Sequence, residues 1–89
     1  MELGAIYATK GVAECASRNP AFMVELSIIL ARYCFGDWGE LCKEDWVQND
    51  HALLAGGRIL GSYDTCAGRV WIITEWDRSA TTFLFPHEY

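Results

Sequence analysis

The spacing of apolar residues changes along the chain from a helical period to a strand period. Between residues 9 and 54, apolar positions recur every three or four residues, which is typical of amphipathic helices. Between residues 59 and 85 they recur every second residue, in stretches rich in β-branched and aromatic side chains, which is typical of strands. The sequence therefore predicts a single α+β domain, with about three helices followed by a three-stranded antiparallel β-meander.

A short first helix is predicted to end near Asn19, because Pro20 disfavours the helical conformation in the residue before it. Thr9 is the candidate N-cap. The apolar face of this helix carries Val12, Cys15 and Ala16. The preceding segment, Ala5-Ile6-Tyr7-Ala8, is expected to form either a short edge strand or the lead-in to the helix.

The second predicted helix begins at Pro20 and is apolar on nearly every side. One face carries Phe22, Leu26, Ile29, Leu30 and Tyr33, and this face is widened by Met23, Val24 and Ile28. A helix of this kind is normally central and buried, which is the favoured interpretation. The alternative is that part of Ala21 to Phe35 is an exposed patch that contacts another chain.

The turn Gly36-Asp37-Trp38-Gly39 ends that helix, and a third helix is predicted from Glu40 to Leu54. Its apolar side is expected to carry Leu41, Cys42, Trp46 and Leu53. Glu40 and Glu44, four residues apart, share the opposite side. Gly56-Gly57 ends this helix with permissive backbone.

The three predicted strands span residues 59–63, 70–76 and 81–85. A hairpin loop at residues 64–68 joins the first two, and a tight connection at residues 77–80 joins the last two. Arg78 in this connection is expected to pair with a nearby acid. Pro86 ends the last strand.

The charge of the chain, −5 with seven scattered basic residues, disfavours direct binding to nucleic acid or to an anionic membrane. The longest apolar stretch is too short and too polar to span a bilayer. The N-terminus lacks the basic and apolar regions of a signal peptide. We therefore expect a cytoplasmic protein whose four cysteines stay free.

No catalytic motif or metal-binding spacing is present, so no catalytic residue, metal or cofactor is predicted. His51 and His87 lie far apart, and small buried hydrophobes are the favoured interpretation of the cysteines. The remaining alternative is a small enzyme or metal protein that assembles its scattered Cys and His residues in space. Such a site would combine a histidine with Cys34, Cys42 and Cys66.

Five carboxylates lie between residues 37 and 50, opposed only by Lys43. Carboxylates on one rigid helix produce a negative field that steers a basic partner and competes with nucleic acid for it. The alternative is an ordinary solvated helix face, with acids that suit the helix dipole. The candidate partner-binding residues are Asp37, Trp38, Glu40, Glu44, Asp45 and Asp50.

Two tryptophans lie in or beside this acidic stretch. Trp38, in its glycine-flanked turn, is either a half-exposed interface anchor or a residue that packs beneath the sheet. For Trp46, on the apolar side of its helix, packing is the favoured interpretation.

Two stretches carry a family resemblance. One runs from Gly36 to Asp45 and continues to Asn49-Asp50. The other runs from Arg58-Ile59-Leu60 through Ile72 to Glu75, Asp77 to Ser79 and Thr81-Thr82, and ends with Leu84 to Pro86 and Glu88-Tyr89. Together, over about residues 30 to 89, they resemble a family of small "plasmid-related" proteins on plasmids, integrative elements and phages of gut bacteria. Trp76 stands where the family pattern leads us to expect a small residue.

The resemblance implies a setting rather than an activity, since small proteins of mobile elements often serve transfer or counter-defence. An acidic protein of this size suits an inhibitor of a host nucleic-acid-binding complex, including CRISPR effectors, which hold nucleic acid in positively charged channels. The leading hypothesis is a non-enzymatic, anti-CRISPR-like binding protein whose partner is a host protein or ribonucleoprotein with a basic surface. The alternatives are an interaction module that acts as a homodimer, and the small metal protein or enzyme described above.

Overall fold

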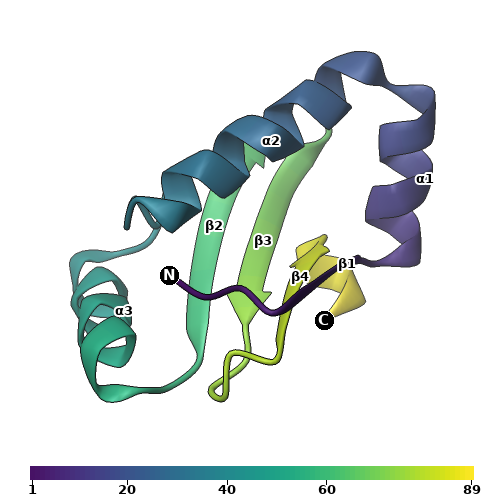
Figure 1. The fold of residues 1–89 in the computed structure, drawn as a ribbon. Helices are drawn as coiled ribbons and strands as arrows, with labels where there is room; N and C mark the ends of the chain where they lie inside the picture. Colours follow the sequence, from purple (N-terminus) through teal and green to yellow (C-terminus); the bar gives the residue numbers. More distant parts are fainter.

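The computed structural model describes residues 1–89 and combines helices with one sheet, so the α+β class is confirmed (Figure 1). The elements in chain order are β1 (Ala5–Ala8), α1 (Lys10–Arg18), α2 (Pro20–Cys34), α3 (Lys43–Ala55), β2 (Ile59–Thr65), β3 (Gly68–Thr74), β4 (Ala80–Leu84) and the 3-10 turn η1 (Pro86–Glu88).

The sheet has four strands in the order β1-β4-β3-β2. Strands β2, β3 and β4 form the antiparallel meander that the alternating pattern predicts. Strand β1 joins β4 in parallel, with Ala8 opposite Phe83. The prediction of a purely antiparallel, three-stranded sheet after the helices is therefore wrong, because the segment at residues 5–8 takes the edge-strand alternative.

Helix α2 crosses one face of the sheet, and α1 lies next to the edge of the sheet that β1 forms (Figure 1). The core between them is rich in aromatic side chains, which bury large areas in a short chain. Its largest fully buried members are Trp38, Tyr33, Tyr63, Phe22, Ile59 and Ile72. The Tyr33 hydroxyl donates to Thr74 Oγ1 over 2.6 Å, and burial raises the pKa of Tyr33 to about 12.

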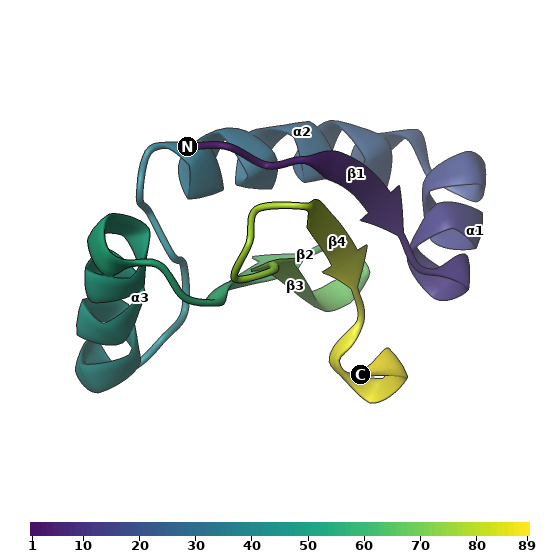
Figure 2. The same ribbon diagram turned by 60° about the horizontal axis from the view of Figure 1, so that its bottom comes forward.

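The C-terminal tail lies on the other side of the sheet from α2 (Figure 2). The ring of Tyr89 meets Trp71 edge to face, with 5.8 Å between centroids, and Arg58 lies over the Tyr89 ring at 5.1 Å. On that face Ile73 and Leu84 are only 3% and 5% exposed. The tail therefore helps to close a second, smaller apolar layer.

Glu88 fastens this tail to the start of α1. Its carboxylate accepts hydrogen bonds from Thr9 Oγ1, from the backbone N–H of Gly11 and from that of Phe85, over 2.5, 2.9 and 3.0 Å. The Thr9 hydroxyl is the main reason that the pKa of Glu88 lies below its usual range. Thr9 thus precedes α1 as predicted, but its side chain contacts Glu88 instead of capping the helix.

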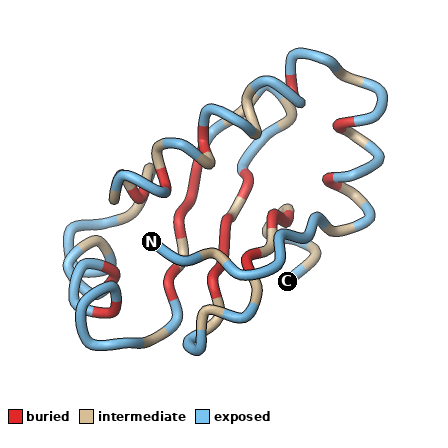
Figure 3. Tube along the Cα trace, viewed as in Figure 1, coloured by how far each residue is buried: buried red, intermediate tan, exposed pale blue.

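Helix α2 is buried on one side only, and the prediction of all-round burial is wrong. Phe22, Ile29 and Tyr33 face the sheet. Met23, Val24 and Ile28 are 51%, 59% and 54% exposed, and Phe35 beyond the helix end is 92% exposed. Figure 3 shows the exposed outer side of this helix. Helix α2 therefore carries more apolar residues than the fold of one chain buries.

Candidate binding surface

The segment before α3 lies along the free edge of β2. The backbone N–H of Glu40 donates to the Ser62 carbonyl over 2.6 Å, and the Ser62 N–H donates to the Trp38 carbonyl over 3.0 Å. Between these bonds Gly39 has φ 77°, and a Cβ there would lie 2.0 Å from the Ser62 oxygen. Glycine is required at this position both for the left-handed conformation and for the close approach.

Trp38 packs beneath this segment and is 0% exposed, so the packing alternative is the observed one. Its ring meets Tyr33 edge to face, with 5.4 Å between centroids. Its Nε1 donates to Asp50 Oδ1 over 2.9 Å. A buried indole N–H needs an acceptor, and Asp50, which is exposed on α3, supplies one. Neither ring face of Trp38 is therefore open to a partner.

Asp37 has a structural partner of its own. Arg32 Nε, from the last turn of α2, donates to its carboxylate over 2.7 Å, and the Gly39 N–H donates over 3.0 Å. Arg32 is the main reason that the pKa of Asp37 lies below its usual range. Because Arg32 compensates its charge, Asp37 adds little to an external negative field.

The remaining carboxylates face water. Glu40, Glu44 and Asp45 are exposed, and none of them forms an ion pair or a side-chain hydrogen bond. Helix α3 begins at Lys43 rather than at Glu40, so two of these acids lie in its first turn and the third lies just before it. Acids at this end are stabilised by the helix dipole, and they remain free to meet a cation.

The buried side of α3 agrees only in part with the predicted one. Leu41 and Trp46 are half-buried and pack against the core as predicted, whereas Cys42 is exposed and Leu53 is 40% exposed. The helix begins three residues later than predicted, so Leu41 and Cys42 precede it. Its fully buried residues are Asn49 and Ala52.

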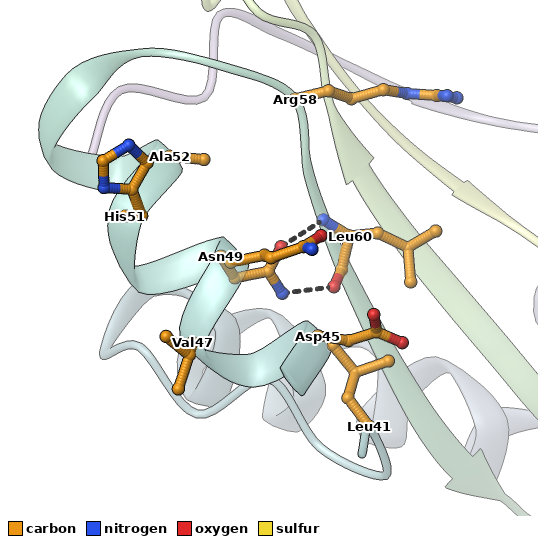
Figure 4. Close-up of a pocket in the computed structure, with 9 residues that line it drawn as sticks. Leu41, Asp45, Val47, Asn49, His51, Ala52, Arg58 and Leu60 are labelled. Atoms are coloured by element: carbon orange, nitrogen blue, oxygen red, sulfur yellow. Dashed lines mark hydrogen bonds between the residues drawn. The ribbon is translucent and has the colours of Figure 1, made fainter. Parts of the chain in front are cut away.

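Asn49 closes the edge of β2. Its Nδ2 donates to the Leu60 carbonyl over 2.7 Å, and its Oδ1 accepts from the Leu60 N–H over 3.3 Å (Figure 4). The Asn49 side chain thus bonds to the two backbone groups of Leu60 that would otherwise pair with a neighbouring strand. A polar residue on an otherwise apolar helix side is the one sequence signal that could have pointed to this role.

A cleft of about 750 Å³ lies between α3 and the start of β2 (Figure 4). Leu41, Ala52 and Leu60 contribute to its apolar lining. Arg58, just before β2, lies at one end of the cleft, and Asp45, on the first turn of α3, lies at the other end. Arg58 is held by the C-terminal Tyr89, whose hydroxyl it reaches over 2.6 Å. Asp45 is the one carboxylate that lines the cleft.

Two further sequence expectations differ from the structure. Cys34, Cys42 and Cys66 are exposed and Cys15 is half-buried, so their interpretation as buried hydrophobes is wrong; all four are free. Arg78 pairs with no acid. It donates to the carbonyls of Ala52 and Gly57, over 2.9 and 2.6 Å, and so ties the end of α3 to the β3–β4 connection.

No three His, Cys, Asp or Glu side chains lie close enough together to hold a metal ion. None of the helices combines the length and the apolar character that crossing a bilayer requires.

Comparisons with protein-family models, with curated proteins and with solved structures found no match to this chain.

Proposed function

We propose that this chain is a non-enzymatic binding protein that covers a basic surface on a host nucleic-acid-processing or defence complex. The observation that carries the proposal is the set of three unpaired, exposed carboxylates, Glu40, Glu44 and Asp45, beside a cleft that apolar side chains line in part. Fixed negative charge accelerates the encounter with a positive surface and excludes nucleic acid from it.

The cleft adds a contact that charge alone does not provide. A lysine or arginine side chain carries an aliphatic stem below its charged group. Such a stem fits along Leu41 and Leu60, with the charged group at the carboxylate of Asp45. The surface therefore suits a basic protein segment better than a free cation, and the resemblance to plasmid-related proteins supports the choice of a host complex as its source.

A charge-reversal experiment tests this proposal. The chain is immobilised, a lysate of a gut bacterium is passed over it, and bound proteins are eluted with rising salt. We expect a nucleic-acid-binding complex to elute as salt screens the charges. We expect the triple variant Glu40→Lys, Glu44→Lys, Asp45→Lys to retain at least about tenfold less of it.

The matched control carries Glu2→Lys, Glu14→Lys and Glu75→Lys, which change the net charge equally at sites away from α3. This control should retain the partner more strongly than the α3 variant does. An equal loss of partner in both variants would show that net charge, and not the position of these carboxylates, determines capture. Undiminished capture by the α3 variant would contradict the proposal.

A further inference from the structure

The flank of α2 that faces β1 carries no charge, whereas Glu25 and Arg32, both half-exposed, lie on the opposite flank and contact Cys66 and Tyr63. Every exposed residue of this helix is uncharged, and the set consists of Pro20, Ala21, Met23, Val24, Ser27, Ile28, Ala31 and Cys34. Phe35 continues it beyond the helix end. Apolar residues exposed singly are ordinary, but an uncharged helix face on a chain of net charge −5 indicates a covered surface.

Strand β1, next to this helix, has an open edge. It pairs only with β4, and at its two ends the N–H groups of Ala5 and Thr9 donate to the carbonyls of Ser79 and Phe83. Since backbone groups alternate in direction along a strand, those of Ile6 and Ala8 point away from β4. The opposite edge of the sheet is closed by Gly39 and Asn49, whereas β1 has no charge, proline or covering segment.

A groove of about 400 Å³ joins β1 to the near flank of α2, while Val24, Ile28 and Phe35 lie on the other side of the helix and do not line it. Ile6 and Tyr7 of β1 and Met23 and Ser27 of α2 line it together, over Leu26, Leu30 and Phe83. Ten of its eleven lining residues are apolar. In Figure 2, β1 runs alongside α2 on this side of the molecule.

We infer that a second copy of this chain covers this surface, with β1 pairing antiparallel to β1 of the other copy. With Tyr7 on the two-fold axis, Ile6 lies opposite Ala8 of the second copy, and Ala8 lies opposite Ile6 of the second copy. Each of these two pairs forms two backbone hydrogen bonds, one from each N–H to the opposite carbonyl. The result is one continuous eight-stranded sheet with both α2 helices on the same face.

Charge favours a second copy over the basic partner of α3. Two chains of net charge −5 repel each other unless they meet on neutral surfaces, and residues 3–9 and all residues that line the groove are uncharged. A basic partner would find no carboxylate there. The acidic residues lie at the β2 edge, which the dimer leaves farthest from its axis.

Three large side chains of the groove are half-exposed: Ile6, Tyr7 and Met23 are 52%, 57% and 51% exposed. Pairing with a second copy covers these side chains together with the open backbone edge of β1.

Light scattering coupled to gel filtration tests the inference. The native chain should have the mass of two chains, and Met23→Lys in the groove should have the mass of one. Leu54→Lys, at a leucine 90% exposed on α3, is the matched control and should remain a dimer. A native chain with the mass of one chain, or a Met23→Lys variant with the mass of two, would overturn the inference.

A crosslink gives a second measurement that does not depend on the folding of Met23→Lys. Across the proposed axis the two Tyr7 Cα atoms lie about 4.5 Å apart, within the range that a disulfide spans. With the four native cysteines replaced by serine, Tyr7→Cys should give a covalent dimer on mild oxidation, and Gln48→Cys on α3 should not. Equal crosslinking of both variants, or none at Tyr7→Cys, counts against the pairing.

Discussion

Gly39 shows how the acidic segment is built from residues that have no contact with a partner. Asp37, Trp38 and Asp50 each complete a contact within the chain, and Gly39 lets the backbone approach β2. The specific residue types from Gly36 to Asp50 are therefore explained largely by the attachment of α3 to the sheet edge. Charge at a given position in the sequence does not reveal this, because Arg32, which neutralises Asp37, comes from another helix.

Gly39→Ala should destabilise the fold by at least about 2 kcal/mol, since it adds left-handed strain to a clash with the Ser62 carbonyl. Gly36→Ala is the matched control: Gly36 also has positive φ, 81°, but no atom lies within 4 Å of its Cβ position. Its cost should be about 1 kcal/mol from strain alone. Urea unfolding of both variants measures the difference, and equal costs would refute the close approach.

Glu88 makes stability depend on pH. Its pKa in the folded chain lies below the ordinary 4.5, chiefly through Thr9. Its contribution is therefore complete above pH 4.5 and is lost as the pH falls through the lower folded value. Glu88→Gln should lower the urea midpoint at neutral pH and flatten its decline in acid. Glu2→Gln, at an exposed side chain outside any helix and without hydrogen bonds, should leave both unchanged, and an unaltered acid decline in Glu88→Gln would contradict this role.

At the scale of elements, Asn49 holds α3 against β2. Asn49→Ala leaves the N–H and carbonyl of Leu60 without partners at a half-buried edge, which should cost about 2 kcal/mol in unfolding free energy. The Leu60 amide should also exchange its hydrogen faster. Gln48→Ala, at the exposed neighbouring position, should change stability by less than about 0.5 kcal/mol. An unchanged exchange rate at Leu60 in Asn49→Ala would show that the edge is closed by other means.

The sequence pattern predicted the elements better than their arrangement. Period and turn residues located α1, α2 and the β2–β3–β4 meander, because these signals are local. They did not predict that β1 pairs with β4, since that parallel pairing joins residues 5–8 to residues 80–83 across most of the chain. The start of α3 was placed too early because Glu40 and Leu41 fit a helical period, whereas the Glu40 backbone bonds to Ser62 of β2.

For α2, the pattern contained both answers. An apolar face at helical spacing correctly indicated Phe22, Ile29 and Tyr33 as core residues. Met23, Val24 and Ile28 are equally apolar, but they are exposed to solvent. Hydrophobicity reports that a surface is to be covered but not whether the same chain or another one covers it. That distinction required the sheet topology.

At the scale of the whole molecule, the two proposed surfaces lie at opposite edges of the sheet. The neutral surface of β1 and α2 lies at one edge, and the acidic surface of α3 lies beside β2 at the other. Pairing of two chains through the first surface would leave both acidic surfaces free at the far ends. Self-association and partner binding are therefore separable by mutation: Met23→Lys affects the first, and reversal of Glu40, Glu44 and Asp45 affects the second.

The most direct test of the proposed function is competition for nucleic acid. The complex captured by this chain is purified, loaded with labelled nucleic acid and titrated with the native chain, with the α3 charge-reversal variant and with the matched charge control. The account predicts that the native chain displaces the nucleic acid, and that the α3 variant needs at least about tenfold more protein to do so than the control. Binding of the native chain without displacement, or equal displacement by the α3 variant and the control, would contradict it.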